Sequence, residues 1–166
     1  SSCPIDDWAH ESCHKTHVVY LANSSHLKVG ITRAEQVPTR WIDQGAMQAL
    51  VIARVSNRRQ AGLVEVALKQ HVSDRTNWRK MLREDSQPID LKEHRQKLMD
   101  LASSELHEIQ GRYRKGQIQY LDAEDTLSLR FPGQYQLDKI KSHSLDKIKV
   151  LQGELLGIKG QYLIFS

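Results

Sequence analysis

The sequence predicts an α/β fold with a small, mostly antiparallel, three-stranded sheet flanked by helices. Two short runs rich in β-branched residues, 18–21 and 27–32, are separated by a polar turn and indicate a hairpin. A continuous apolar run of strand length, 49–55, indicates a third and central strand. The next segment carries Ala61, Val64 and Leu68 at helical spacing. We expect a long helix and a β-rich C-terminal module to follow this unit.

Local signals define the ends of the first elements. The polar run 23–26 suits a hairpin turn, and Gly30 in the second strand indicates a bulge or a close backbone contact. Pro38 suits a first helical turn, so we expect a short helix over 39–44 that ends at Gly45. Ser56 or Asn57 can cap the helix that follows the third strand.

The sequence pattern changes in the second half of the chain. Residues 74–82 suggest a turn that enters a short helix, and the longest helix is expected from Pro88 to about Arg114. A capping-box pattern over 90–93 begins it, and its apolar stripe comprises Leu98, Leu101, Ile109 and Tyr113. Strand-like runs follow at 126–131, 147–156 and 161–165, separated by 132–133 and 157–160, and indicate a meander or partial barrel.

These changes divide the chain into four parts. We expect an irregular N-terminal arm (1–16), an α/β domain (17–86), a helical connector (87–117) and a β-rich module (118–166). No apolar run approaches the ~20 residues that span a bilayer, so we expect a soluble, cytoplasmic protein without a membrane partner. Ser1 in place of an initiator Met and a strand-like end at Ser166 suggest a fragment of a longer chain.

Positive charge is concentrated in one segment. Residues 54–83 hold eight cations against Glu65 and Asp74, so their net charge of +6 exceeds the +4 of the whole chain. The eight cations are Arg54, Arg58, Arg59, Lys69, Arg75, Arg79, Lys80 and Arg83. Such a run can be a solvated helix face or a surface for a polyanion. Its position beside the candidate site described below favours phosphate binding.

The two cysteines, Cys3 and Cys13, lie close together at the N-terminus, near His10, His14 and His17. A structural disulfide is disfavoured in the cytosol. The cluster could hold zinc, could be half of a zinc site completed elsewhere, or could be inert, and its spacing matches no standard zinc module.

Residues 16–82 resemble the GIY-YIG nuclease fold. Val18-Val19-Tyr20 occupies the place of the first motif and the run 28–32, Lys-Val-Gly-Ile-Thr, the place of the second. Arg40 lies on the following helix, and Glu65 closes the helix turn 61–65 that matches the one presenting a glutamate. Asn77 falls where such proteins often place a polar residue that completes the site. The second motif commonly begins with tyrosine, and this chain has Lys28 there, as some nucleases of the fold do.

The whole chain is also similar to an uncharacterised bacterial family. The strings at 18–33, 38–46 and 156–164 are nearly identical to those of its members. These proteins usually carry additional cysteines before the nuclease-like part, which would make Cys3 and Cys13 the remainder of a zinc-binding N-terminus.

The residue types suit hydrolysis of a phosphodiester, which needs a water, a base and positive charge at the phosphate. Glu65 would hold one Mg²⁺ or Mn²⁺. Tyr20 could take the proton of the water if Lys28 lowers its pKa. Arg40 would hold the scissile phosphate. His26 and Asn77 are auxiliary candidates without an assigned role.

The expected function is therefore that of a metal-dependent endonuclease, with DNA favoured over RNA. The candidate nucleic-acid-binding residues are Arg33, Arg58, Arg59, Lys69, Arg75, Arg79 and Lys80. A catalytically inactive nucleic-acid-binding protein of the same fold is the first alternative, favoured by Lys28, and a basic protein-interaction scaffold is the second. Taken singly, Tyr20 is more typical of a packing residue, and Trp41 and Trp78 of core residues. We expect the side chains of Tyr20, Lys28, Arg40 and Glu65 to face one concave surface.

Overall fold

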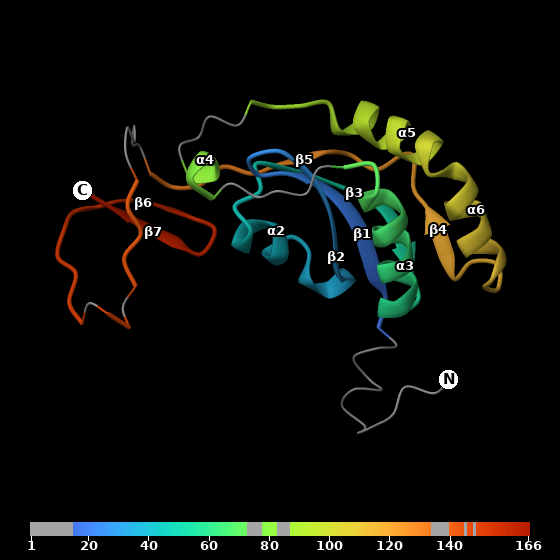
Figure 1. The fold of residues 1–166 in the computed structure, drawn as a ribbon, viewed down its shortest axis with the longest axis horizontal. Helices are drawn as coiled ribbons and strands as arrows, with labels where there is room; N and C mark the ends of the chain where they lie inside the picture. The colour runs from blue at the N-terminus through green and yellow to red at the C-terminus, as the bar shows by residue number, and fades with distance from the viewer. Residues whose placement is uncertain (1–14, 73–77, 83–86, 134–139, 145, 148) are drawn as a thin grey trace, which may run out of the picture.

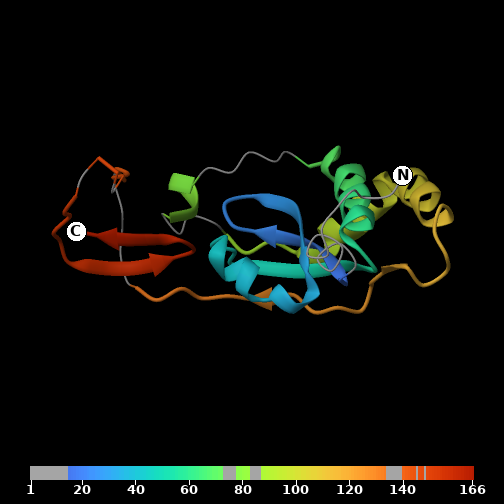
Figure 2. The ribbon, with the colours of Figure 1, turned by 90° about the horizontal axis from the view of Figure 1, so that it is seen from below.

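A mixed α/β architecture with an antiparallel sheet at its centre is seen in the computed structural model of the chain (Figure 1). The structure describes residues 15–72, 78–82, 87–133, 140–144, 146–147 and 149–166. One core packs α3, α5 and α6 against one face of the sheet, and a smaller core packs α2 against the other. A separate two-stranded hairpin lies at the end of the molecule opposite α6 (Figures 1 and 2).

Strand β1 (His17–Asn23) is the centre of the sheet, because it pairs antiparallel with β2 (Leu27–Arg33) and with β3 (Gln48–Val55). All of its residues are buried. In the register with β2, Tyr20 lies opposite Gly30 and Ala22 opposite Lys28. Directly opposed residues share a face and alternate residues return to it. Tyr20, Lys28 and Gly30 are therefore on the same face, which is the one that α2 covers.

Two short strands extend the predicted three-stranded sheet to five. Strand β4 (Ile118–Tyr120) and strand β5 (Leu127–Ser128) both pair with β3 on the edge that β1 leaves open. The chain between and after them runs along the sheet toward the C-terminal hairpin (Figure 2). Strands of two or three residues are too short to give a period-two pattern, so the sequence did not place them in this sheet.

The helices around the site follow the predicted signals closely. A 3₁₀ turn, η1 (Ala34–Gln36), precedes α2 (Thr39–Asp43), and Gly45 ends that region with φ 65°. Helix α3 (Arg58–Lys69) is capped by Asn57, whose side chain accepts a hydrogen bond from the Gln60 N–H. Because Ala61, Val64 and Leu68 are buried against the sheet, the opposite positions of α3 point outward.

The prediction of one long helix over 88–114 is wrong in one respect. The structure has two helices there, α5 (Leu91–Leu101) and α6 (Ser103–Gly111). The predicted cap is confirmed, since Asp90 accepts from the Glu93 N–H at 3.0 Å. At Ala102 the backbone leaves helical geometry with φ −93° and ψ 10°. Ala102, four residues after Leu98, takes the core-facing place, and Leu101, predicted to be in the stripe, is 62% exposed.

The C-terminal hairpin differs from its predicted boundaries. The short helix α4 (Trp78–Leu82) precedes α5, and the hairpin consists of β6 (Leu155–Lys159) and β7 (Tyr162–Phe165), which pair antiparallel. Residues 157–159, expected to separate two strands, lie within β6, and of the residues that the structure describes in 147–156 only the last two are in a strand. The turn is at Gly160, whose φ of 59° favours glycine. No helix in the described ranges has the length and apolar character needed to cross a membrane.

The cap of α3 gives a test of how this helix is held. Asn57→Ala removes the acceptor for the Gln60 N–H, so we expect the free energy of unfolding to fall by about 0.5–2 kcal/mol in urea titrations. Asn57→Ser keeps an acceptor at the cap and should retain most of that stability. Equal losses for the two variants would contradict a capping role.

Candidate functional site

The ring of Tyr20 lies directly over Gly30 of the neighbouring strand. A Cβ atom at Gly30 would be 2.6 Å from both Cζ and Oη of Tyr20, which no side chain can tolerate without movement. The ring meets the indole of Trp41 edge to face, with centroids 5.7 Å apart. Tyr20 is 1% exposed. Gly30 therefore supplies the close backbone contact that the sequence indicated, and its missing side chain gives the tyrosine its place.

The Tyr20 hydroxyl belongs to a short polar chain that ends at Arg40. The amide of Gln44 lies 3.0 Å from the hydroxyl. In the amide orientation that satisfies both neighbours, its nitrogen donates to Tyr20 Oη and its oxygen accepts from Nε and Nη2 of Arg40 at 3.1 and 3.2 Å. Two donors from one guanidinium fix the plane of that group. Tyr20 and Gln44 thus orient Arg40, and the sequence analysis did not single out Gln44.

The expectation that nearby cations lower the pKa of Tyr20 is wrong. Burial raises the pKa of Tyr20 above its usual value of 10.0, and this outweighs the lowering by Arg40 and by the bond to Gln44. At neutral pH the phenol therefore keeps its proton and acts as a hydrogen-bonding group rather than as a ready base.

Glu65 of α3 lies within electrostatic reach of Tyr20. Its carboxylate is one of the groups that raise the pKa of the phenol. The side chain of Glu65 is 19% exposed and pairs with Lys69 at 3.2 Å. It is therefore not sealed among aliphatic groups. A partly exposed carboxylate with one displaceable cation suits the single protein ligand that Mg²⁺ often takes.

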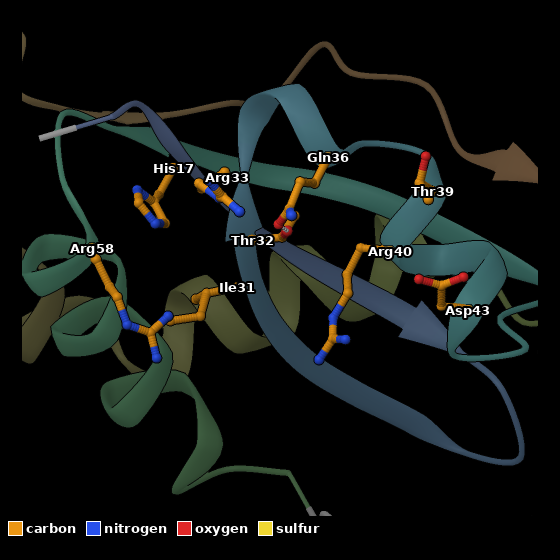
Figure 3. A pocket seen from close by; sticks show the side chains of 9 residues that line it. All are labelled: His17, Ile31, Thr32, Arg33, Gln36, Thr39, Arg40, Asp43 and Arg58. Atoms are coloured by element: carbon orange, nitrogen blue, oxygen red, sulfur yellow. Dashed lines mark hydrogen bonds between the residues drawn. The ribbon is translucent and has the colours of Figure 1, made fainter. Parts of the chain in front are cut away.

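A basic pocket of about 380 Å³ opens beside Arg40 (Figure 3). Arg58 of α3 and Arg40 of α2 flank Ile31 and Thr32 of β2, and Arg33 follows on the same strand. Three arginines against the single carboxylate of Asp43 leave this pocket with an excess of two positive charges. Arg33 also contacts Glu35 at 3.4 Å, whereas Arg40 and Arg58 form no ion pair within the described part of the chain. The pocket suits a phosphate group.

His17 lines the same pocket, a position that the sequence analysis considered only as part of a zinc cluster. Its Nδ1 donates to the backbone carbonyl of Lys15 at 2.7 Å, so Nε2 is the acceptor of the neutral ring. Burial lowers the pKa of His17 below its usual 6.5, and Arg58 and Arg33 lower it further, while the bond to Lys15 and the charge of Glu35 oppose this. The β-branched residues Val18 and Val19, which follow His17, were the available signal that it begins a strand.

A second pocket of about 280 Å³ adjoins the first at Arg40 and Asp43. Lys28 lines it, so the lysine of the second motif shares this pocket with Arg40. Gln161 and Tyr162 of the C-terminal hairpin form part of its wall. Of the four predicted side chains, Arg40 lines both pockets and Lys28 lines the second, whereas Tyr20 and Glu65 line neither of the two. The prediction that all four face one concave surface is therefore not confirmed.

The other predicted residues lie apart from this centre. Arg59 and Arg79 are exposed and line neither pocket, and the charge of Lys69 is offset by Glu65. His26 lies in the turn after β1, where its Nδ1 is 2.9 Å from Ser25 Oγ. Among the described residues, no group of three or more histidine, cysteine or acidic side chains is placed to hold a metal ion. Outside the described residues, or with side chains outside them, are Cys3, Cys13, Arg75, Asn77 and Lys80.

The chain belongs to the family described as protein of unknown function (DUF2797), which it matches over residues 1–166. No curated protein and no solved structure matches it. The description of the family names no activity, so function has to be argued from the site.

The packing of Tyr20 on Gly30 can be tested directly. Gly30→Ala places a methyl group 2.6 Å from the phenol, and we expect a loss of about 1–3 kcal/mol in the free energy of unfolding. Gly62→Ala is the matched control, since a Cβ there meets nothing within 4 Å and helix propensity favours alanine. A Gly30→Ala protein as stable as the Gly62→Ala protein would contradict the contact.

The buried histidine predicts an acid-sensitive fold. Since the pKa of His17 is lowered from 6.5 in the folded state, the unfolded chain binds the proton first as the pH falls. His17 should therefore cost stability below pH 6.5 and none well above it. His17→Asn, which keeps a donor for Lys15, should flatten the loss of unfolding free energy between pH 8 and pH 5, measured in urea. His107→Asn removes an exposed histidine as a control, and the same pH dependence in both variants would refute this origin.

Proposed function

We propose that this protein is a metal-dependent endonuclease that hydrolyses phosphodiester bonds of nucleic acid. The observation that carries the proposal is the setting of Arg40. Gln44 and Tyr20 orient its guanidinium at the edge of an arginine-lined pocket, and a carboxylate, Glu65, lies within electrostatic reach of the same tyrosine. A fixed cation, an anion pocket and a partly exposed carboxylate that could hold a metal ion would supply the positive charge that phosphodiester hydrolysis needs at the phosphate.

The arginines of the pocket would bind the phosphate. Arg40 presents a planar fork of donors whose partner on the protein side is the neutral amide of Gln44, so its charge stays available for an anion. Arg58 supports the same pocket from α3, on the other side of β2 (Figure 3). Charge that develops on the phosphate in the transition state would be stabilised by donors already in place.

Glu65 is the residue that would hold the metal, with water and phosphate oxygens completing the shell as Mg²⁺ and Mn²⁺ prefer. Bound there, the ion would act as a Lewis acid toward the phosphate and lower the pKa of the attacking water. The attacking water gives up a proton to solvent and its oxygen forms the new bond to phosphorus as the P–O ester bond breaks, and the leaving oxygen takes a proton from solvent. Tyr20 keeps its own proton and holds Gln44 and Arg40 in position throughout.

A second candidate function, binding of nucleic acid without cleavage, is favoured by a specific observation. Tyr20 is buried, its pKa is raised, and its hydroxyl is already bonded. It is therefore a poor base for the water. Under this reading the arginine pocket binds the phosphate backbone, and no turnover follows.

Substitution of Glu65 distinguishes the two candidate functions, cleavage of nucleic acid and binding without cleavage. With Mg²⁺ or Mn²⁺, we expect the protein to cleave fluorescent DNA oligonucleotides and Glu65→Gln to cut at least about 100-fold more slowly. Isothermal titration with Mn²⁺ should show weakened metal binding for the same variant. Lys69→Met removes the cation that pairs with Glu65 and should strengthen the binding of Mn²⁺.

The control for this experiment is Glu93→Gln. Glu93 pairs with Lys97 at the same helical spacing as Glu65 with Lys69, yet lies on α5 away from the pockets. It should leave both cleavage and Mn²⁺ affinity unchanged. Binding of DNA by the unaltered protein with no cleavage in either metal would exclude the nuclease and favour the second candidate.

A further inference from the structure

The pocket shared by α2 and the C-terminal hairpin has the character of a ligand subsite. Its walls come from segments far apart in the chain: Lys28 of β2, Arg40 and Gln44 around α2, Met81 of α4, and the end of the β6–β7 hairpin. Its volume of about 280 Å³ is just below the usual range for small-molecule sites, so it suits a group no larger than one nucleoside.

Close backbone contacts fix these walls in place. Gly160, with φ 59°, packs so tightly that a Cβ there would be 2.9 Å from the Asp43 carbonyl oxygen. Gly45, with φ 65°, packs equally tightly against α4, since a Cβ there would be 2.6 Å from Met81 Sδ. Both positions have the left-handed backbone that favours glycine, and the contact at Gly160 is with backbone atoms. The end of α2, the hairpin turn and α4 therefore converge at positions whose backbone favours glycine.

The rest of the hairpin is anchored as well. Its Ile158 N–H donates to the Pro132 carbonyl at 3.1 Å, and the buried amine of Lys159 lies 5.9 Å from the centroid of the Phe131 ring. Ile164 packs with Met81 and Leu82 in a small core of its own. Tyr162 is therefore presented on a supported strand rather than on a loose end.

The lining is aromatic and amphipathic rather than simply basic. Tyr162 is 41% exposed and offers a ring, and Met81 offers a polarizable thioether. Around them lie the amides of Gln44 and Gln161 and the carboxylate of Asp43. These groups can form hydrogen bonds with donors and acceptors on the edge of a flat ligand. An aromatic face with hydrogen-bonding groups at its rim is how proteins hold an unstacked nucleobase.

The class of ligand follows from the residues that this pocket shares with the arginine pocket. Arg40 and Asp43 line both pockets, so a phosphate held at Arg40 has its neighbouring nucleoside at the mouth of the second one. We propose that the second pocket binds one unpaired nucleobase on Tyr162, and that the substrate of this site is single-stranded nucleic acid. The proposal rests on the proposed function of the Arg40 site in so far as that site binds the adjoining phosphate. A base inside a duplex is stacked and could not enter.

The test measures binding without divalent metal, so that cleavage plays no part. Fluorescence anisotropy is followed with a labelled 12-nucleotide DNA strand, its blunt duplex, and strands with one abasic position. Tyr162→Ala should weaken binding of the single strand by about 5- to 150-fold and leave binding of the duplex unchanged. Tyr162→Phe keeps the ring and should stay within about twofold of the unaltered protein.

Leu163→Ala is the matched control, because Leu163 is the next residue of β7, is 61% exposed and does not line the pocket. Removing the base from the ligand tests the same contact with the protein intact. The best abasic position should cost the unaltered protein a similar factor and cost Tyr162→Ala nothing further. Equal effects on single strand and duplex, or additive losses from the variant and the abasic strand, would overturn the subsite.

The outcomes also separate this inference from the nuclease proposal. Cleavage by the unaltered protein, with Tyr162→Ala binding and cutting as well as Leu163→Ala, would overturn the base subsite and leave the nuclease. Coupling between Tyr162 and the missing base without any cleavage in Mg²⁺ or Mn²⁺ would support the subsite and remove the nuclease. If the protein bound neither the single strand nor the duplex at low salt, both the base subsite and the nuclease proposal would be overturned.

Discussion

The absence of a side chain at Gly30 is the constraint on which the site depends. Because nothing projects from that position of β2, the ring of Tyr20 can lie across the strand, with its hydroxyl at Gln44 and its edge against Trp41. Gln44 in turn fixes the guanidinium of Arg40. Any side chain at position 30 would displace the ring and, through it, the orientation of the cation. A contact inside the sheet thus sets the geometry of a group that lines two surface pockets.

Much of the fold could be predicted from local sequence signals. The β-branched runs gave β1 and β2, the apolar run gave β3, and the spacing of Ala61, Val64 and Leu68 gave α3. Features set by tertiary contact were missed. Strands β4 and β5 exist only because β3 has a free edge, and the break at Ala102 keeps both α5 and α6 against one core. The hairpin turn lies at Gly160, where the backbone is left-handed and packs closely against Asp43 and Gly45, a contact that local sequence does not reveal.

The candidate site was predictable in its residue types and less so in its electrostatics. The order of Tyr20, Lys28, Arg40 and Glu65 along the chain was enough to expect them near one another. It could not show that burial would outweigh the cations at Tyr20 and raise its pKa, because that balance depends on how completely the ring is covered. Gln44 and Tyr162 were missed for another reason. An amide, or a tyrosine distant in the chain, carries no signal until folding brings it to Arg40.

The neutral partner of Arg40 explains how one residue can serve two adjoining pockets. Asp43 lines both pockets, and an ion pair between it and Arg40 would have cancelled the charge that an anion needs. Instead the guanidinium is held by an amide oxygen, and no ion pair of Arg40 is present in the described part of the chain. Asp43 repels phosphate from its own end, so an anion is favoured toward Arg33 and Arg58. Under the two proposals above, the pocket on the other side of Arg40 would receive the uncharged base that neighbours this phosphate.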